Sequence, residues 1–304
     1  MISRRRFIAL SAAFSLSSTL PPARASSKPV QPVSRWRGTA LGAEAEITLQ
    51  GPATWTEPLL REAEKTLADV DALFSLFNAN SSLARLNAAG KITEQDARFH
   101  RLLDLAHEVH RLTDGLFDPT VQPLWQALAN GGDIKSAREA VGWHNVQRSG
   151  TRVQLAEGQA ITLNGIAQGF ATDLIAEAFQ RAGARRTLIN IGEFRAIGGP
   201  WHVGLSDPNH GLIGRRIVSN SAIATSSPGV LTFAGADTHI LNPAAPSAPL
   251  WSTVSVEADS AALADGLSTA LCHANTHFIR TALAANPHVQ RITLIDSDGD
   301  LVTL

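Results

Sequence analysis

Hydrophobic residues recur at helical spacing in several stretches of the chain, and these stretches predict its helices. Apolar side chains return every three or four residues along residues 57–74, 99–112 and 260–275, which gives each stretch one apolar face. A shorter helix is predicted over residues 81–87, with a serine as its N-cap. Another short helix is predicted over 137–141, where a glycine follows.

Runs of alternating or β-branched apolar residues predict the strands between these helices. A short run over 160–163 stands directly before a helical pattern that begins near Ile166, and a buried run over 186–191 follows that helix. This order predicts a βαβ-like unit whose ligand edge lies at the strand ends, and the whole chain reads as mixed α/β. The other predicted strands are residues 38–49, 202–205, 217–218, 222–227, 239–243 and 252–256, and two more that flank an Asp-Gly turn within 292–304.

Two glycines, Gly165 and Gly169, stand where the predicted strand turns into the helix. Glycine lets another chain or a ligand approach the backbone closely, and a helix N-terminus presents unpaired N–H groups that bind anions. A Gly-x-x-x-Gly spacing is less specific than a complete phosphate-binding loop. From this stretch alone, an anion site and a tight turn without a ligand both remain open.

The first 25 residues have the pattern of an export signal. Three arginines at positions 4–6 precede a mildly apolar stretch, and small residues lead to Ala25. This order predicts a secretory signal, and the paired arginines favour the twin-arginine route, with cleavage after Ala25 and a periplasmic mature protein. A basic tail on a cytosolic protein is the alternative. Residues 26–35 are rich in Ser, Pro and Lys and predict a linker, so the folded domain is expected over 36–304.

The charge and cysteine content exclude several classes of function. The formal net charge is −1, and loss of the four arginines among residues 1–25 brings it to −5, which argues against a nucleic-acid partner. Cys272 is the single cysteine, so the sequence predicts neither a disulfide framework nor a thiolate metal site, and no cysteine near Ala25 can take a lipid anchor. No apolar run reaches the roughly 18 residues of a membrane span.

Asp265 and Thr269 form the strongest candidate for a metal site. They are four residues apart in the predicted helix 260–275, so both side chains project from one face. A carboxylate, a hydroxyl and nearby carbonyls are the hard oxygen ligands that Mg²⁺ takes. The alternative is a solvated aspartate and a threonine bonded back to its own helix. Asp118 is a separate candidate for contact with a bound molecule, because Pro119 is expected to keep its backbone extended and its carboxylate available to a ligand.

Two other stretches are better explained without a metal. His107 and His110 are three residues apart with a glutamate between them, whereas the zinc-protease pattern needs histidines four apart. Asp296, Asp298 and Asp300 alternate as in a calcium loop, but no glutamate closes that loop. We interpret the histidines as helix-surface residues and the aspartates as part of an Asp-Gly hairpin between two strands.

Taken in order, these segments resemble the ApbE-type FAD:protein FMN transferases, a family of periplasmic flavin transferases. The resemblance covers nearly all of the mature chain, and the ordered motifs together are far more specific than any one of them. It implies an α+β fold, with mixed sheets and flanking helices, over residues 36–304. The matching stretches are residues 37–39, 74–77, 82–87, 113–124, 165–173, 188–198, 222–226, 239–243 and 264–270.

Departures from the common pattern of the family resemble one subgroup. The family's Asp-Leu-Gly-Gly-Ile-Ala-Lys-Gly-Tyr reads Thr-Leu-Asn-Gly-Ile-Ala-Gln-Gly-Phe at residues 162–170. Thr162 thus replaces a carboxylate near the flavin, and Gln168 replaces a cation that would pair with an FAD phosphate. This form, together with residues 192–195, resembles the NosX subgroup, whose members serve nitrous oxide reductase and act on a NosR-like membrane protein.

The resemblance also implies which residues hold the metal and the flavin. His239, which matches the family's His-x-x-Asp-Pro motif, and Asp265 are expected to be catalytic. Phe77 stands where a tyrosine often stacks on the flavin, and phenylalanine can still stack. The expected metal ligands are the Gly165 carbonyl, Asp265, the Ser268 carbonyl and Thr269. The expected FAD contacts are Phe77, Leu116, Phe117, Asp118, Thr162, Gln168 and Ile240.

The function that the resemblance implies is Mg²⁺-dependent transfer of FMN from FAD to a threonine hydroxyl of a periplasm-facing partner protein, with release of AMP. Two alternatives remain open at this point. One is a periplasmic FAD carrier without transferase activity, which the replacements at Thr162 and Gln168 favour. The other is a hydrolase that splits FAD into FMN and AMP without an acceptor protein.

Overall fold

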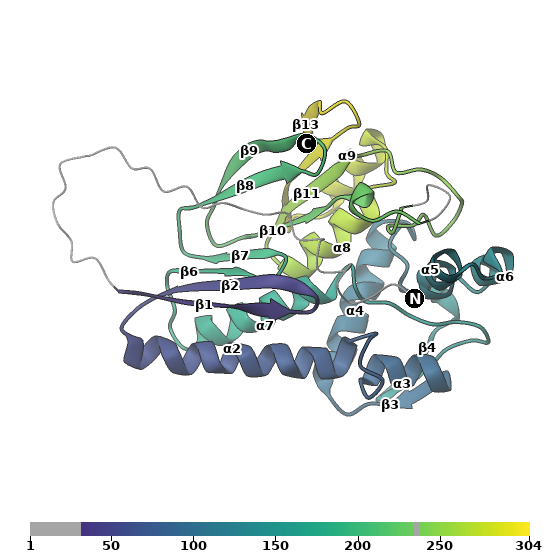
Figure 1. Ribbon diagram of the computed structural model, residues 1–304, viewed down its shortest axis with the longest axis horizontal. Helices are drawn as coiled ribbons and strands as arrows, with labels where there is room; N and C mark the ends of the chain where they lie inside the picture. Colours follow the sequence, from purple (N-terminus) through teal and green to yellow (C-terminus); the bar gives the residue numbers. More distant parts are fainter. Residues whose placement is uncertain (1–31, 234–237) are drawn as a thin grey trace.

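An antiparallel sheet of eight strands forms the centre of the molecule, and helices pack against it (Figure 1). The computed structural model describes residues 32–233 and 238–304, so the predicted export signal and most of the predicted linker lie outside the described residues. Every neighbouring pair in this sheet is antiparallel. In spatial order its strands are β1 (Val33–Ala40), β2 (Ala43–Gln50), β6 (Thr187–Asn190), β7 (Phe194–Ile197), β10 (Ala222–Ser226), β11 (Thr253–Ala258), β12 (Val289–Ile295) and β13 (Leu301–Thr303).

Two smaller sheets accompany the large one. A three-stranded sheet has the order β3 (Lys91–Thr93), β5 (Arg152–Gln154) and β4 (Gln147–Ser149). A two-stranded hairpin consists of β8 (Trp201–Asp207) and β9 (Gly211–Val218). The mixed α/β fold class is therefore confirmed.

The helical patterns of the sequence are confirmed in the described residues, with shifts of a few residues at their ends. Two helices, α5 and α9, were not predicted, because α5 begins among turn formers and α9 follows α8 after four residues. The α-helices are α2 (Ala53–Phe74), α3 (Ser82–Ala89), α4 (Ala97–Leu112), α5 (Gln122–Asn130), α6 (Ile134–Glu139), α7 (Ala167–Arg181), α8 (Ala261–Leu271) and α9 (Thr276–Ala285). The short 3-10 helices are η2 (Pro119–Val121), η3 (Trp143–Asn145) and η4 (Pro228–Val230).

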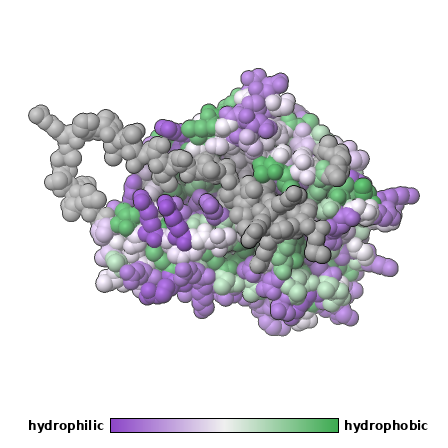
Figure 2. Space-filling view, in the orientation of Figure 1, coloured by the Kyte–Doolittle hydropathy of each residue, from purple (hydrophilic) through white to green (hydrophobic). Residues whose placement is uncertain are grey.

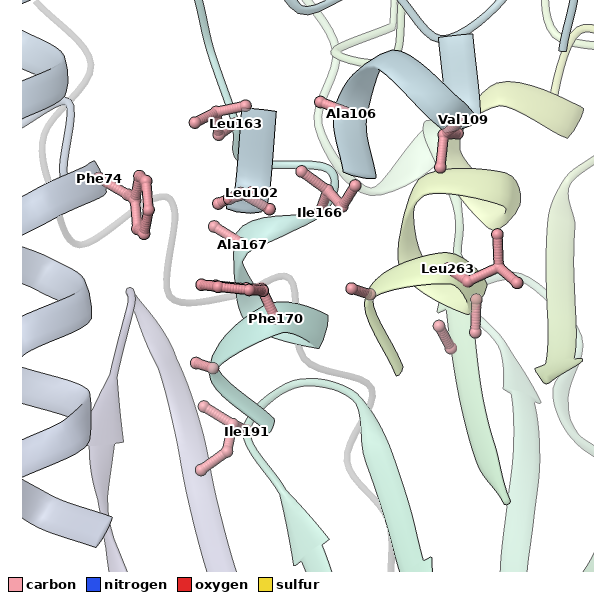
Figure 3. Close-up of a cluster of buried hydrophobic side chains, with 14 of the residues drawn as sticks. Phe74, Leu102, Ala106, Val109, Leu163, Ile166, Ala167, Phe170, Ile191 and Leu263 are labelled. Atoms are coloured by element: carbon pink, nitrogen blue, oxygen red, sulfur yellow. The ribbon is translucent and has the colours of Figure 1, made fainter. Parts of the chain in front are cut away.

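The central strands of the large sheet are buried on both faces, and neighbouring residues of one strand belong to different cores. In β6, Ile189 joins the main core with the helices, while Leu188 joins a smaller core under the β8–β9 hairpin. Helices α2, α4, α7 and α8 all contribute to the main core, as the side chains of Phe74, Val109 and Phe170 show in Figure 3. Helices α7 and α8 therefore lie within the main core.

The chain enters the sheet through a tight β1–β2 hairpin rather than through a single strand. Ala40 and Ala43 are paired, and the two residues between them, Leu41 and Gly42, have φ of +50° and +84°. Such a two-residue turn with positive φ matches the twist of a hairpin. Residues 33–35, which composition assigned to the linker, are part of β1, so the predicted end of the linker is wrong.

The predicted strand over 160–163 is wrong, although the segment is held in a fixed place. The side chain of Asn87 donates to the carbonyl of Ile161 at 2.8 Å and accepts from its N–H at 2.8 Å. This amide thus replaces the neighbouring strand that a sheet would supply. Residues 155–166, which lead into α7, form no strand, and β5 before them belongs to the three-stranded sheet. Because the large sheet is also antiparallel throughout, the predicted βαβ-like unit is wrong.

Residues 239–243 also form no strand. Among the described residues of this segment, one isolated bridge joins Thr232 and Thr238, and the chain then bends at His239 and Ile240. The side chain of Asn242 accepts hydrogen bonds from the N–H groups of Ala244 and Ala245, which turns the chain instead of extending it.

The C-terminal aspartates form a hairpin turn, as the sequence predicts. Asp296 Oδ1 accepts hydrogen bonds from the N–H groups of Asp298 and Asp300, both at 2.9 Å, between β12 and β13. This end of the molecule, at the top of Figure 2, is hydrophilic. Within residues 32–233 and 238–304, no helix has both the length and the apolar composition that crossing a membrane requires.

Candidate functional site

Helices α7 and α8 approach each other closely and bring distant parts of the chain together. A Cβ on Gly169 would lie 2.3 Å from the carbonyl oxygen of Ala261, so only glycine permits this contact. One turn further along α7, the carboxylate of Asp173 accepts hydrogen bonds from the N–H groups of Ala261 and Ala262, each at 2.9 Å, and from Ser260 Oγ at 2.7 Å. Asp173 thus caps α8 from outside and fixes it against α7.

Asp265 is the buried carboxylate at this contact. Its side chain is 4% exposed, and Oδ2 accepts a hydrogen bond from the N–H of Gly169 at 3.0 Å. Burial raises the pKa of Asp265 to about 7; the Gly169 N–H opposes this shift, and the charge of Asp173 adds to it. The alternative of a solvated helix residue is therefore wrong.

Gly165 lies directly before the N-cap of α7, Ile166, so its carbonyl is outside the hydrogen-bonded helix. The N–H of Gly169 is one of the unpaired donors in the first turn of α7, and Asp265 caps it. In the described part of the chain no backbone N–H reaches the carbonyl of Gly165, and Thr269 Oγ1 lies 3.5 Å from it. A carbonyl without a backbone donor, beside a carboxylate and a hydroxyl, is suited to a cation.

A pair of serines joins the cluster from β10 and α8. Ser226 Oγ lies 2.8 Å from Ser268 Oγ and 3.4 Å from Thr269 Oγ1. The carbonyl of Ser268 accepts a hydrogen bond from Cys272 Sγ at 3.2 Å, within the same helix. The expected role of the Ser268 carbonyl as a metal ligand stays a prediction. The side chain of Ser268 lies in a cluster of hydroxyl groups with Ser226 and Thr269.

Glu193 is a second buried carboxylate in this region and was not among the predicted site residues. It lies between β6 and β7, is 7% exposed, and accepts a hydrogen bond at Oε2 from the N–H of Thr225 at 3.0 Å. Burial raises the pKa of Glu193 well above its ordinary value, and the charge of Asp265 raises it further. The sequence does contain a signal for this residue. An acidic residue between two strands of buried apolar residues cannot contribute to the hydrophobic core, which indicates another role.

The side chain of Gln168 packs against the same turn. Gly192 has φ of +92°, and a Cβ at this position would lie 2.9 Å from Gln168 Nε2. The turn therefore needs glycine for its conformation and for space. Because Gln168 is neutral, it adds no positive charge beside Asp265 and Glu193.

The donor atoms around Asp265 fit a hard divalent cation. Asp265 offers a negative oxygen, and Gly165 and Thr269 offer neutral ones. Mg²⁺ commonly binds proteins through one or two carboxylates and takes further oxygens from phosphates and water. Within residues 32–233 and 238–304, no group of three or more His, Cys, Asp or Glu side chains is arranged to hold a metal. A cation at this place would therefore be held by at most two carboxylates, and neutral protein oxygens or a bound phosphate would complete its coordination.

Asp118 is not available to a ligand, which corrects the expectation from the sequence. Its backbone is extended, with φ of −130° and ψ of 109°, as Pro119 predicts. However, Oδ1 accepts from the N–H and the hydroxyl of Thr120, at 2.8 and 2.5 Å, and Oδ2 accepts from the N–H of Trp143 at 3.1 Å. The carboxylate is 8% exposed and fastens the loop to η3.

The rest of this loop lies beside the segment that leads into α7. The N–H of Thr162 donates to the carbonyl of Pro119 at 2.8 Å. Phe117 is 5% exposed and Leu116 is half-buried, while His110 Nδ1 donates to the carbonyl of Phe117 at 2.8 Å. The structure thus brings Thr162 together with the loop that contains Leu116, Phe117 and Asp118.

His239 is bound to the segment that directly follows the serine of β10. Its Nδ1 lies 3.1 Å from the carbonyl of Pro228, two residues after Ser226. Since a carbonyl only accepts, Nδ1 carries the proton and Nε2 holds the lone pair in the neutral ring. Burial lowers the pKa of His239, so the neutral ring predominates at pH 7. The neighbouring Ile240 is buried, and its carbonyl accepts from His273 Nε2 at 3.1 Å.

Phe77 is in the loop between α2 and α3 and is 52% exposed. The loop starts from a fixed point, because Phe74 at the end of α2 packs edge-on against Phe170 of α7 with 6.0 Å between ring centroids. An exposed aromatic ring on an anchored loop offers a surface on which a ligand ring can stack.

Comparison with protein families and with individual proteins gives one consistent result. The model of the ApbE family matches residues 41–293. An FAD:protein FMN transferase of Haemophilus influenzae is 26% identical over 262 residues, which cover 71% of this chain and 72% of that protein. An FAD:protein FMN transferase of Rhodobacter capsulatus is 27% identical over 249 residues, but the match covers 72% of this chain and 46% of that protein, about half of its length.

Solved structures show the same fold at low sequence identity. The ApbE protein of Thermotoga maritima has a TM-score of 0.80 and 24% identity, with 89% of this chain and 96% of that chain covered. The apo form of the Pseudomonas stutzeri flavinyl transferase ApbE has a TM-score of 0.77 and 23% identity, with 91% and 96% covered. At these identities the likeness is evidence for the fold.

Proposed function

The chain belongs to the ApbE family, and we propose that it is an FAD:protein FMN transferase whose phosphate chemistry takes place at Asp265. Both curated relatives bear this activity in their names. The observation that carries the proposal is the grouping of three oxygen donors, namely the carbonyl of Gly165, the hydroxyl of Thr269 and the buried carboxylate of Asp265. These oxygens would hold the Mg²⁺ that an FAD diphosphate requires.

The reaction is a phosphoryl transfer. The oxygen of the acceptor hydroxyl bonds to the phosphorus of the FMN half of FAD, the bond to the AMP half breaks, AMP leaves with that electron pair, and the hydroxyl loses its proton. Mg²⁺, when bound, neutralises the diphosphate. His239 is suited to accept the proton at Nε2, because Nδ1 already donates to Pro228 and burial keeps the ring neutral.

We propose in addition that the acceptor residue is a threonine of a periplasm-facing, NosR-like membrane protein in a nitrous-oxide-reductase system. The NosX-like form of residues 162–170 supports the system. The arginines at positions 4–6 and the small residues before Ala25 support a periplasmic location.

A mass measurement on the acceptor tests the proposed function. The purified chain is incubated with FAD, with MgCl₂ or EDTA, and with an acceptor domain that carries the candidate threonine or an alanine in its place. Transfer predicts that the threonine acceptor gains the mass of FMN and that AMP appears in equal amount, with MgCl₂ only. FMN and AMP free in solution would instead identify a hydrolase, and FAD bound without products would identify a carrier.

Phe77→Ala is expected to weaken FAD binding by about 1–3 kcal/mol, the scale of a lost aromatic contact. Because Phe77 is 52% exposed, its removal should leave the melting temperature nearly unchanged. Quenching of flavin fluorescence gives the affinity. Val33→Ala, at a residue that is 50% exposed in β1, is the matched control. Equal affinities for wild type and Phe77→Ala would exclude Phe77 from the flavin site.

Replacement of Arg4 and Arg5 by lysine is expected to stop export, because the twin-arginine route reads the arginine pair itself. The uncleaved precursor should then accumulate in the cytoplasm, with mature protein lost from the periplasmic fraction. Immunoblots of the two fractions measure this. Mature protein in the periplasm of the double variant would contradict the assigned route.

A further inference from the structure

Glu193 and Asp265 are two buried carboxylates without a basic partner in the described part of the chain. They are 7% and 4% exposed, and neither takes part in any ion pair of the described residues. Glu257, which is 8% exposed in the neighbouring β11, is the opposite case, because Arg216 Nε and Arg291 Nη1 lie 3.3 and 3.5 Å from its Oε1. Burial of an unpaired negative charge is unfavourable, so such a carboxyl group either keeps a proton or is balanced by a cation.

Two chains of contacts place Glu193 beside the oxygens around Asp265. On one side, Glu193 Oε2 is bonded to the N–H of Thr225, and the next residue, Ser226, contacts Thr269. On the other side, the preceding Gly192 packs on Gln168, whose neighbour Gly169 donates to Asp265. The two contact chains converge on Asp265 and Thr269.

Each carboxylate of the pair keeps one oxygen without a hydrogen bond among the described residues. Glu193 uses Oε2 and Asp265 uses Oδ2, which leaves one oxygen of each carboxylate for a ligand. The carbonyl of Gly165 accepts only a long hydrogen bond from Thr269 Oγ1, at 3.5 Å, and all of these oxygens are hard donors. The ligand that satisfies both charges and the carbonyl is a divalent cation.

We propose that Glu193 is a second carboxylate of the cation site and that, with Asp265, it binds a divalent cation in the flavin-free protein. The protein therefore binds Mg²⁺ before FAD, and the diphosphate of FAD binds to a site that already contains the metal. This proposal rests on the proposed function, because the proposed function is what identifies the oxygens around Asp265 as a cation site. Its test uses neither FAD nor an acceptor protein, so the two can fail separately.

Titration of the flavin-free full chain with Mn²⁺, followed by the electron paramagnetic resonance signal of free Mn²⁺, tests the proposal. Wild type should bind Mn²⁺, and MgCl₂ should displace it. Glu193→Gln keeps the size and the acceptor oxygen toward Thr225 but removes the charge, and it should weaken Mn²⁺ binding by about tenfold or more. The control Glu257→Gln removes an equally buried charge that arginines already balance, and it should leave Mn²⁺ affinity within about twofold.

A second variant keeps the proposal testable if Glu193→Gln does not fold. Glu193→Ala removes both the charge and the side-chain oxygens of this residue, and it should also weaken Mn²⁺ binding by about tenfold. The proposal is overturned if the flavin-free wild type does not bind Mn²⁺. It is also overturned if every Glu193 variant that folds binds Mn²⁺ with wild-type affinity. Loss of FMN transfer alone, with this pattern of Mn²⁺ binding intact, would instead contradict the proposed function.

Discussion

Asp265→Asn is expected to lower FMN transfer by about a thousandfold while the protein still folds. Asparagine keeps the size of the side chain and an oxygen that can accept the N–H of Gly169, now 3.0 Å from Asp265 Oδ2. It loses the negative charge that a cation needs beside the neutral oxygens of Gly165 and Thr269. The acceptor mass assay, in single-turnover form, measures the rate. The control Asp104→Asn, at an exposed aspartate of α4, should transfer at the wild-type rate.

The pH dependence of the free energy of unfolding gives a second, independent test of the negative charge that Asp265→Asn removes. The pKa of Asp265 is about 7 in the folded, metal-free protein, above its ordinary value of 3.8. A raised carboxyl pKa makes a stabilising contribution that is complete below the unfolded pKa and is lost as pH rises toward the folded one. In EDTA, wild type should therefore lose stability between about pH 4 and 7 more steeply than Asp265→Asn. Equal slopes, together with wild-type transfer by the variant, would contradict both the metal assignment and the mechanism.

The spacing of helical residues made the central part of the site predictable from the sequence. Asp265 and Thr269 share a helix face at i and i+4, and α8 forms where the pattern placed it. The Gly165 turn was predictable as a helix start, since α7 begins at Ala167. What brings these two helices into contact is a long-range fit at Gly169. The glycine indicates that something can approach the backbone there, but no local pattern identifies the N-terminus of α8 as that partner.

Long-range hydrogen bonds explain the predictions that were wrong. The segment 160–163 has strand-like residues, but the side chain of Asn87, more than 70 residues earlier, satisfies Ile161. Asp118 was read as free because local rules describe its backbone only, whereas its second oxygen is bonded to Trp143. Glu193 was missed for the same reason, because its significance depends on burial beside Asp265.

Gly169→Ala is expected to destabilise the protein by about 3 kcal/mol or more, the upper range of overpacking in a core. The new Cβ would lie 2.3 Å from the carbonyl oxygen of Ala261 and 2.7 Å from Ala262 Cα. Both are backbone atoms, so no side-chain rotation relieves the contact. The N-terminus of α8 also cannot retreat without breaking its two N–H bonds to Asp173. The helices must separate, or the variant must stay partly unfolded.

Urea unfolding, followed by circular dichroism, measures the effect against Gly214→Ala. Gly214 is in β9, where the nearest atom to a new Cβ is Arg216 Nη1 at 3.8 Å, an ordinary contact. This control should change stability by less than about 0.5 kcal/mol. Separation of α7 from α8 also lengthens the bond from Gly169 to Asp265 and moves Gly165 away from Thr269. Folded Gly169→Ala should therefore bind Mn²⁺ poorly as well. Wild-type stability in Gly169→Ala would mean that the two helices are not held at the distance on which the cation site depends.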